Sequence, residues 1–169
     1  MNAFIQLKKI TPLFGVSFVF ACFAFSSTAR AVSPPPDGGY PGGNTAEGNA
    51  ALRDLTTGEF NTAVGLFSLT LNTGGNSNTA VGASALRNNT SAHQNTAVGA
   101  DALRLNTTGS ENNAIGAFAL SNNSDGHENN ALGADALREN RHASKNTAIG
   151  DEALDSNDSS GNGNANDNT

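Results

Sequence analysis

Four arginines recur at multiples of 17 residues along this chain: Arg53, Arg87, Arg104 and Arg138. Guanidinium groups bind carboxylates and phosphates through paired hydrogen bonds, so a file of arginines is a candidate surface for an acidic matrix protein or polysaccharide. Aspartates stand close to three of them, at Asp54, Asp101 and Asp135. Exposed pairs of this kind form a solvated edge and add little stability. We expect the arginines to be paired in this way, with ligand binding as the alternative.

The histidines of the chain do not form a metal-binding pattern. His93 and His127 lie 34 residues apart, and two stacked β coils separate such residues by ~10 Å. A metal ion lies ~2 Å from each histidine nitrogen, so one ion cannot join them. No Ser/His/Asp or Cys/His pairing recurs, and there is no glycine-rich calcium repeat. We therefore expect no metal site, no cofactor and no enzymatic activity.

An internal repeat of 17 residues positions these side chains. Each repeat begins Asn-[Thr/Asn]-Ala, has glycine as its fifth residue and leucine as its ninth, and the first residues are Asn44, Asn61, Asn78, Asn95, Asn112, Asn129 and Asn146. A fixed period without insertions indicates that each repeat is one coil stacked on the last. We predict an all-β fold, a parallel β-solenoid of seven 17-residue coils over residues 44–161. The coils are numbered one to seven below, and positions within a coil are counted from its asparagine.

Few large apolar residues are available to each coil. Position 4 is aliphatic in every coil except the first, which has Glu47, and position 8 is small. We expect positions 4 and 9 to be the apolar anchors, on two short strands per coil, since β-branched residues before glycine are typical of a strand that ends in a turn. The predicted core and ladder residues of coils two to four are Asn61, Val64, Gly65, Leu69, Asn78, Val81, Gly82, Leu86, Asn95, Val98, Gly99 and Leu103.

Asparagine occupies position 1 of every coil and position 12 of every coil except the first. Stacked coils place these amides above one another, where each can donate to one neighbour and accept from the other. We predict structural ladders, and glycan binding by exposed amides is the alternative. Glu47 and Leu55 interrupt the pattern in coil one, which is typical of a terminal cap.

The segments outside the repeat predict an exported protein. Lys8 and Lys9, an apolar run and Ala29-Arg30-Ala31 are typical of a secretory signal peptide over residues 1–31. Residues 32–43 are a Pro/Gly-rich spacer, and residues 162–169 are expected to form a disordered tail. Removal of the signal leaves six basic and 15 acidic residues, a net charge of −9. Such a surface repels nucleic acid and anionic lipid, and the mature chain has no predicted membrane span.

Four pentapeptides resemble a known family: Asn61–Gly65, Asn78–Gly82, Asn95–Gly99 and Asn146–Gly150. They are similar to the head repeats of trimeric autotransporter adhesins of the YadA type, from Asn44 to about Gly161. The resemblance implies a left-handed β-roll and a homotrimer with the aliphatic strands inside. It also implies display on a bacterial cell surface or outer membrane, and cell adhesion. The repeat is longer than the family's usual coil, and no heptad stalk or run of anchor strands follows it. We therefore expect a truncated or secreted head, or a related repeat protein.

Three functions remain open at this point. The leading hypothesis is an adhesin-like head that binds host matrix, a glycan or other cells through its outer face, and the small core of each coil favours an oligomer. An ice-binding solenoid is the first alternative, because position 2 holds Thr45, Thr62, Thr79, Thr96 and Thr147. Asn113 and Asn130 interrupt that file, and position 4 is aliphatic rather than a second threonine file. A structural fibre module is the other alternative.

Overall fold

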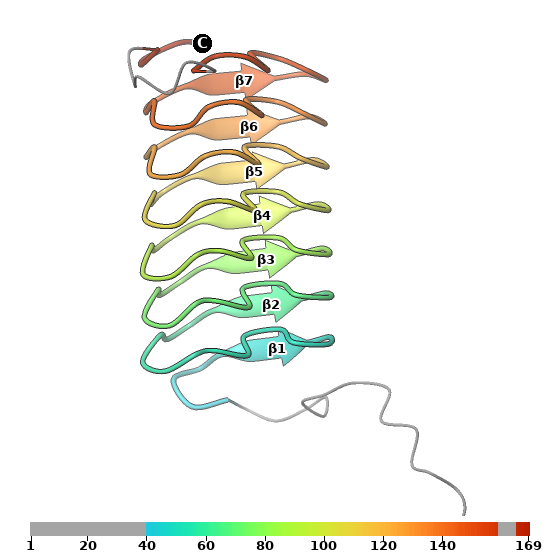
Figure 1. Ribbon diagram of the computed structural model, residues 1–169, viewed down its shortest axis with the longest axis vertical. Helices are drawn as coiled ribbons and strands as arrows, with labels where there is room; N and C mark the ends of the chain where they lie inside the picture. Colours follow the sequence, from blue (N-terminus) through green and yellow to red (C-terminus); the bar gives the residue numbers. More distant parts are fainter. Residues whose placement is uncertain (1–39, 159–164) are drawn as a thin grey trace, which may run out of the picture. The chain divides into compact units, whose positions relative to one another are not determined.

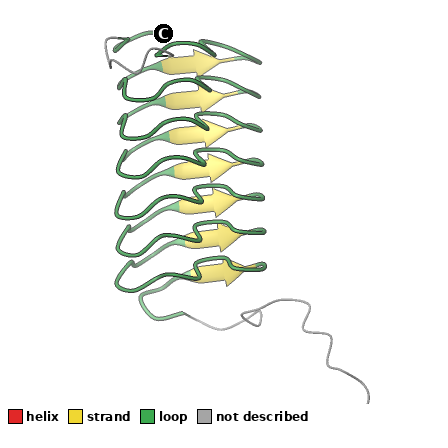
Figure 2. Ribbon diagram, in the orientation of Figure 1, coloured by secondary structure: helices red, strands yellow, loops and turns green. Residues whose placement is uncertain are grey.

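The computed structural model describes residues 40–158 and 165–169 of the chain. The predicted signal peptide and most of the spacer lie outside these residues. These residues contain no helix, as Figure 2 shows. They therefore include no helix that is long and apolar enough to cross a membrane.

The described chain is a parallel β-solenoid with one strand in each coil. The strands are β1 Thr45–Glu47, β2 Thr62–Val64, β3 Thr79–Val81, β4 Thr96–Val98, β5 Asn113–Ile115, β6 Asn130–Leu132 and β7 Thr147–Ile149. They pair in sequence order, all parallel, as the rungs of one seven-stranded sheet (Figure 1). Thr62 pairs with Thr79 and Val64 with Val81, so the register equals the repeat and equivalent residues lie above one another. The predicted fold class and period are confirmed.

Position 4 points away from the interior, and its prediction as a core anchor is wrong for the single chain. Side chains alternate between the two faces of a strand. Ala63 is fully buried while Val64 on the next position is 37 % exposed, and the same holds for Ala80 and Val81. The interior beside the strand admits only a methyl group, so the invariant alanine faces inward and the larger aliphatic residue faces outward.

The apolar interior is filled by one leucine and two small residues from each of coils one to six, whereas Leu154 of coil seven is 37 % exposed. Leu69, Leu86, Leu103, Leu120 and Leu137 at position 9 are fully buried, and they pack with the alanines of positions 3 and 8. The predicted second strand is absent from the described coils. Leu69 has φ 46° and Leu86 has φ 49°, which is left-handed and breaks an extended backbone. This side of the coil still stacks through its backbone, since Leu69 N donates to Ala85 O at 3.0 Å.

Glycine at position 5 is required for two separate reasons. Gly82 has φ +136°, and a Cβ on it would lie 2.4 Å from the carbonyl oxygen of Gly99 in the next coil. Only glycine combines this backbone conformation with so close an approach. The turn after each strand is therefore fixed by its neighbour in the stack.

Two asparagine ladders run along the solenoid, as predicted: the ladder at position 1 passes through all seven coils, and the ladder at position 12 begins at coil two. At position 1, Asn78 Nδ2 donates to Asn61 Oδ1 at 3.1 Å, and at position 12 Asn89 Nδ2 donates to Asn72 Oδ1 at 2.9 Å. Within coil three the two ladders meet, because Asn78 and Asn89 both donate to the carbonyl of Ala92, at 2.9 and 3.1 Å. These asparagines are fully buried. The ladders therefore satisfy interior backbone groups that water cannot reach.

Both ends of the stack carry substitutes for a further coil. Before coil one, Gly42 O accepts from Phe60 N at 2.8 Å, in the pattern that joins two complete coils. After coil seven, Asn168 N donates to Asn146 Oδ1 at 2.9 Å and Asn168 O accepts from Thr147 N at 2.7 Å. Asn168 thus takes the place of a first residue of an eighth coil. Residues 165–169 differ here from the disordered tail expected over 162–169, because this asparagine continues the ladder. Residues 162–164 lie outside the described part.

Candidate interaction surface

The outer face of the sheet carries two parallel files of side chains. Position 2 supplies threonine or asparagine, and position 4 supplies Val64, Val81, Val98, Ile115, Leu132 and Ile149, which are 37 to 73 % exposed. Strand pairing places each file in register along β2 to β7. A continuous file of exposed aliphatic residues makes this face the candidate interaction surface. The residue pattern alone placed position 4 in the core of each coil, whereas the resemblance implied a contact face between copies; the signal for an outward direction was invariant alanine at position 3 beside variation at position 4.

The face is hollowed between the two files over its last three strands. The hollow has a volume of about 220 Å³ and lies between the aliphatic residues of position 4 and the polar residues of position 2 on β5, β6 and β7. Ala131 and Ala148 form its floor, each 3 % exposed. Its wall and floor can receive an aliphatic side chain from outside.

The polar file is itself ordered along part of its length. Asn113 Nδ2 donates to Asn130 Oδ1 at 2.9 Å, so the two asparagines that interrupt the threonines bond to each other. In coils two to four, Thr62, Thr79 and Thr96 are partly buried and point to the same side as Val64, Val81 and Val98. The face is therefore half hydroxyl and half hydrocarbon along three successive strands.

The four candidate arginines are each engaged with a neighbour. Arg53 Nε lies 2.9 Å from Asp54 Oδ1, Arg104 Nε lies 3.3 Å from Asp101 Oδ1, and Arg138 Nη1 lies 3.2 Å from Asp135 Oδ1. These are the three pairs expected from the sequence. The fourth, Arg87, stacks over the ring of Phe67, with 5.4 Å from Cζ to the ring centroid. An acidic ligand would have to compete with these contacts.

In the pair formed by Arg53 and Asp54, the pKa values of both side chains are shifted. The hydrogen bond that Arg53 donates lowers the pKa of Asp54 below its ordinary value, and the same hydrogen bond raises the pKa of Arg53. Both side chains are at the surface, so water screens the pair.

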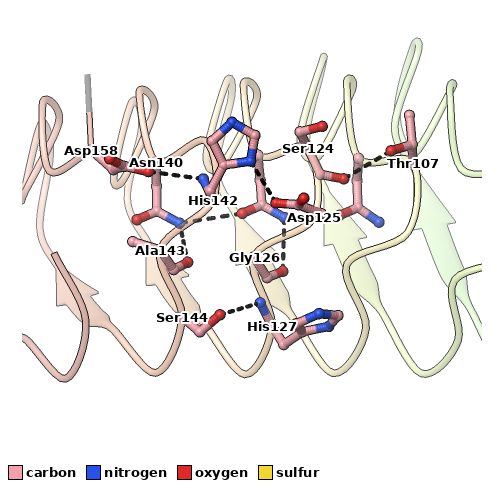
Figure 3. Close-up of polar contacts among 12 residues, drawn as sticks. Thr107, Ser124, Asp125, Gly126, His127, Asn140, His142, Ala143, Ser144 and Asp158 are labelled. Atoms are coloured by element: carbon pink, nitrogen blue, oxygen red, sulfur yellow. Dashed lines mark hydrogen bonds and ion pairs between the residues drawn. The ribbon is translucent and has the colours of Figure 1, made fainter. Parts of the chain in front are cut away.

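The histidines are distributed along the coil corners. His93 and His127 share position 16 in coils three and five, while His142 Nδ1 lies 2.6 Å from Asp125 Oδ1 at position 14 (Figure 3). Among the described residues, no group of three histidine, cysteine or carboxylate side chains could hold a metal ion.

Comparisons with protein-family models, with curated proteins and with solved structures give no match for this chain.

Proposed function

We propose that this solenoid is the self-associating head of an exported surface protein, in which three copies pack through the outer face of the sheet. The observation that carries the proposal is the unbroken file of exposed aliphatic residues from Val64 to Ile149. Burying such a file removes apolar surface from water and stabilises an assembly by ~25 cal/mol per Å². Because each coil alone buries little more apolar surface than one leucine side chain provides, contact between copies would add the apolar burial that a single copy lacks.

The dimensions of the face favour more than two copies. A strand of three residues is ~10 Å wide, and seven strands stack to ~30 Å. The resulting area of roughly 300 Å² is well below the ~800 Å² that each partner buries in a stable pair. In a ring of three, every copy contacts two others and the flanks of the sheet are also covered. The resemblance to trimeric adhesin heads leads to the same arrangement.

Adhesion is the proposed role of the surface that remains outside this assembly. Host matrix protein, a glycan or another cell is the partner that the resemblance implies. The arginine file is the candidate contact for an acidic partner, and Arg87 is its only member described with an aromatic rather than a carboxylate neighbour. Arg87→Gln should therefore weaken binding of an acidic glycan such as heparin more than Arg104→Gln. If both variants bind heparin as tightly as the unmodified protein, the arginine file is not the contact for an acidic partner.

An ice-binding surface is the second candidate, and one observation favours it. The threonine and aliphatic files stand side by side on one exposed face, in register over β2, β3 and β4. In the sequence the aliphatic residues at position 4 count against ice binding, because a second threonine file is missing, whereas in the structure they lie on the same exposed face as the threonines. A regular array of hydroxyl and hydrocarbon groups can order water only if no other copy covers it. The two candidate functions therefore compete for the same surface.

Absolute mass in solution, from light scattering on a sizing column, separates these candidates. A trimeric head requires three times the chain mass, and Val81→Asp should reduce it to a single copy by placing a charge on the contact face. Ser91→Asp is the matched control, because it adds the same charge to an exposed corner of the same coil. A folded monomer that shows thermal hysteresis would contradict the trimer and support ice binding.

A further inference from the structure

A third file of inter-coil hydrogen bonds follows position 16. In each case the backbone N–H of one coil donates to the side chain at the equivalent place in the next. The bonds are Glu59 N to Asn76 Oδ1 at 2.8 Å, Asn76 N to His93 Nδ1 at 3.0 Å, His93 N to Ser110 Oγ at 3.1 Å, Ser110 N to His127 Nδ1 at 3.0 Å, His127 N to Ser144 Oγ at 2.9 Å and Ser144 N to Asn166 Oδ1 at 2.6 Å.

Two of these six acceptors differ chemically from the others. An amide or hydroxyl oxygen accepts a hydrogen bond at any ordinary pH, whereas histidine Nδ1 accepts only while it carries no proton. The hydrogen bonds at His93 and His127 therefore require neutral rings that carry their proton on Nε2. Protonation places a hydrogen on Nδ1 that points at the backbone N–H of Asn76 or Ser110. Those two hydrogen bonds are then lost.

We propose that the position-16 file is a pH-sensitive seam, in which protonation of His93 and His127 releases the backbone of the preceding coil at Asn76 and Ser110. Both histidines are exposed, so a proton reaches them without unfolding of the solenoid. Histidine is the side chain whose charge changes in mildly acidic solution. The seam involves neither position 2 nor position 4, so it does not depend on the proposed self-association.

Charged residues of both signs lie next to the seam. Glu111 follows Ser110 in sequence and its backbone N–H donates to His93 O at 3.1 Å, and Glu128 follows His127 in sequence. The backbone N–H of Lys145 donates to His127 O at 2.9 Å. At position 14, His142 faces Asp125, and protonation strengthens this pair instead of breaking it (Figure 3). The global stability therefore mixes opposing responses, and the test must observe individual amides.

Amide hydrogen exchange of the ¹⁵N-labelled protein tests the seam directly. As the pH falls through the range in which histidine titrates, protection at Asn76 and Ser110 should drop about fivefold, the effect of losing one ordinary hydrogen bond. The amides of Glu59 and Ser144 serve as internal controls, because they donate to Asn76 and Asn166. Ring ¹⁵N shifts at neutral pH should show Nε2–H tautomers for His93 and His127.

The chain supplies its own matched replacement, since asparagine already fills this place at Asn76 and Asn166. His93→Asn combined with His127→Asn should keep both hydrogen bonds and remove the selective response to acid. The proposal is overturned if protection at Asn76 and Ser110 follows the control amides throughout the titration. An Nδ1–H tautomer at neutral pH, or an undiminished response in the double variant, would overturn it equally.

Discussion

Asn61 Oδ1 accepts two hydrogen bonds from Asn78, one from its backbone nitrogen at 3.0 Å and one from Nδ2 at 3.1 Å. The same double contact joins Asn78 to Asn95. One buried oxygen in each coil therefore satisfies the backbone and the side chain of the coil above it. The ladder is both a source of stability and a device that fixes register, because a slip by one residue would leave these amides without partners.

Replacing one member of this ladder should cost far more than an ordinary polar substitution. Asn78→Ala leaves the N–H of Asn95 buried with no acceptor and removes one donor to Ala92 O. We expect a loss of about 3 kcal/mol, because each unsatisfied buried group costs ~1–3 kcal/mol. Denaturant unfolding measures it, with exposed Asn49→Ala as the control. Equal stability of both variants would show that the ladder contributes nothing.

The turn glycines allow steric clash to be separated from backbone strain. Gly99→Ala must accommodate a Cβ 2.4 Å from Gly116 O at φ +137°, whereas the nearest atom to a Cβ on Gly150 is 3.8 Å away at φ +131°. The two sites share the strained φ but only Gly99 has the clash. We expect Gly150→Ala to cost ~1–2 kcal/mol and Gly99→Ala several kcal/mol or failure to fold. Similar losses of unfolding free energy at both sites would show that glycine is required only for its backbone conformation and not to avoid the clash.

The substitute coil at the C-terminal end should protect coil seven locally. Deletion of residues 165–169 removes Asn168 O, the acceptor of Thr147 N, and Asn168 Nδ2, which donates to Asn157 Oδ1 at 3.0 Å. Exchange at the Thr147 amide should accelerate at least tenfold, while the Thr96 amide in coil four should keep its rate. Thr169→Ala, at an exposed residue, is the control. Unchanged exchange at Thr147 in the deletion variant would show that the tail does not hold this coil.

The surface pair at Arg53 and Asp54 gives a prediction of pH dependence. Because the hydrogen bond from Arg53 lowers the pKa of Asp54 in the folded state, the pair stabilises the fold above the unfolded pKa of aspartate. That contribution is lost as the pH falls through the lowered pKa. A carboxyl ¹³C titration should show Asp54 ionising at a lower pH than an ordinary aspartate, and Arg53→Ala should return it toward that value. An identical titration curve in the variant would contradict the role of the hydrogen bond.

The stacking of the chain was predicted from its sequence, whereas the outward direction of the side chains at position 4 was not. Invariant asparagine at two places in a fixed period leads directly to ladders such as Asn61–Asn78 and Asn72–Asn89. The orientation of Val64 was misjudged because a large aliphatic residue is usually placed in a core. In a strand of three residues the fully buried Ala63 decides which side faces inward. The left-handed backbone at Leu69 also has no sequence signal, since leucine rarely adopts positive φ.

Truncating position 9 of a coil should lower its folding stability, whereas truncating position 4 of the same coil should weaken association between copies. Leu103 is fully buried and is the large apolar side chain that coil four contributes to the interior, so Leu103→Ala should cost ~2–5 kcal/mol through the cavity it leaves. Val98 is 37 % exposed, and Val98→Ala removes little burial from a single copy. We expect Val98→Ala to leave the unfolding free energy of a single copy within ~1 kcal/mol while weakening association between copies, because position 4 lies on the face proposed for self-association. Unfolding at a protein concentration below the association midpoint, together with sedimentation above it, measures the two effects separately. A large loss of single-copy stability in Val98→Ala would contradict this interpretation and show that position 4 contributes to the core of the single chain.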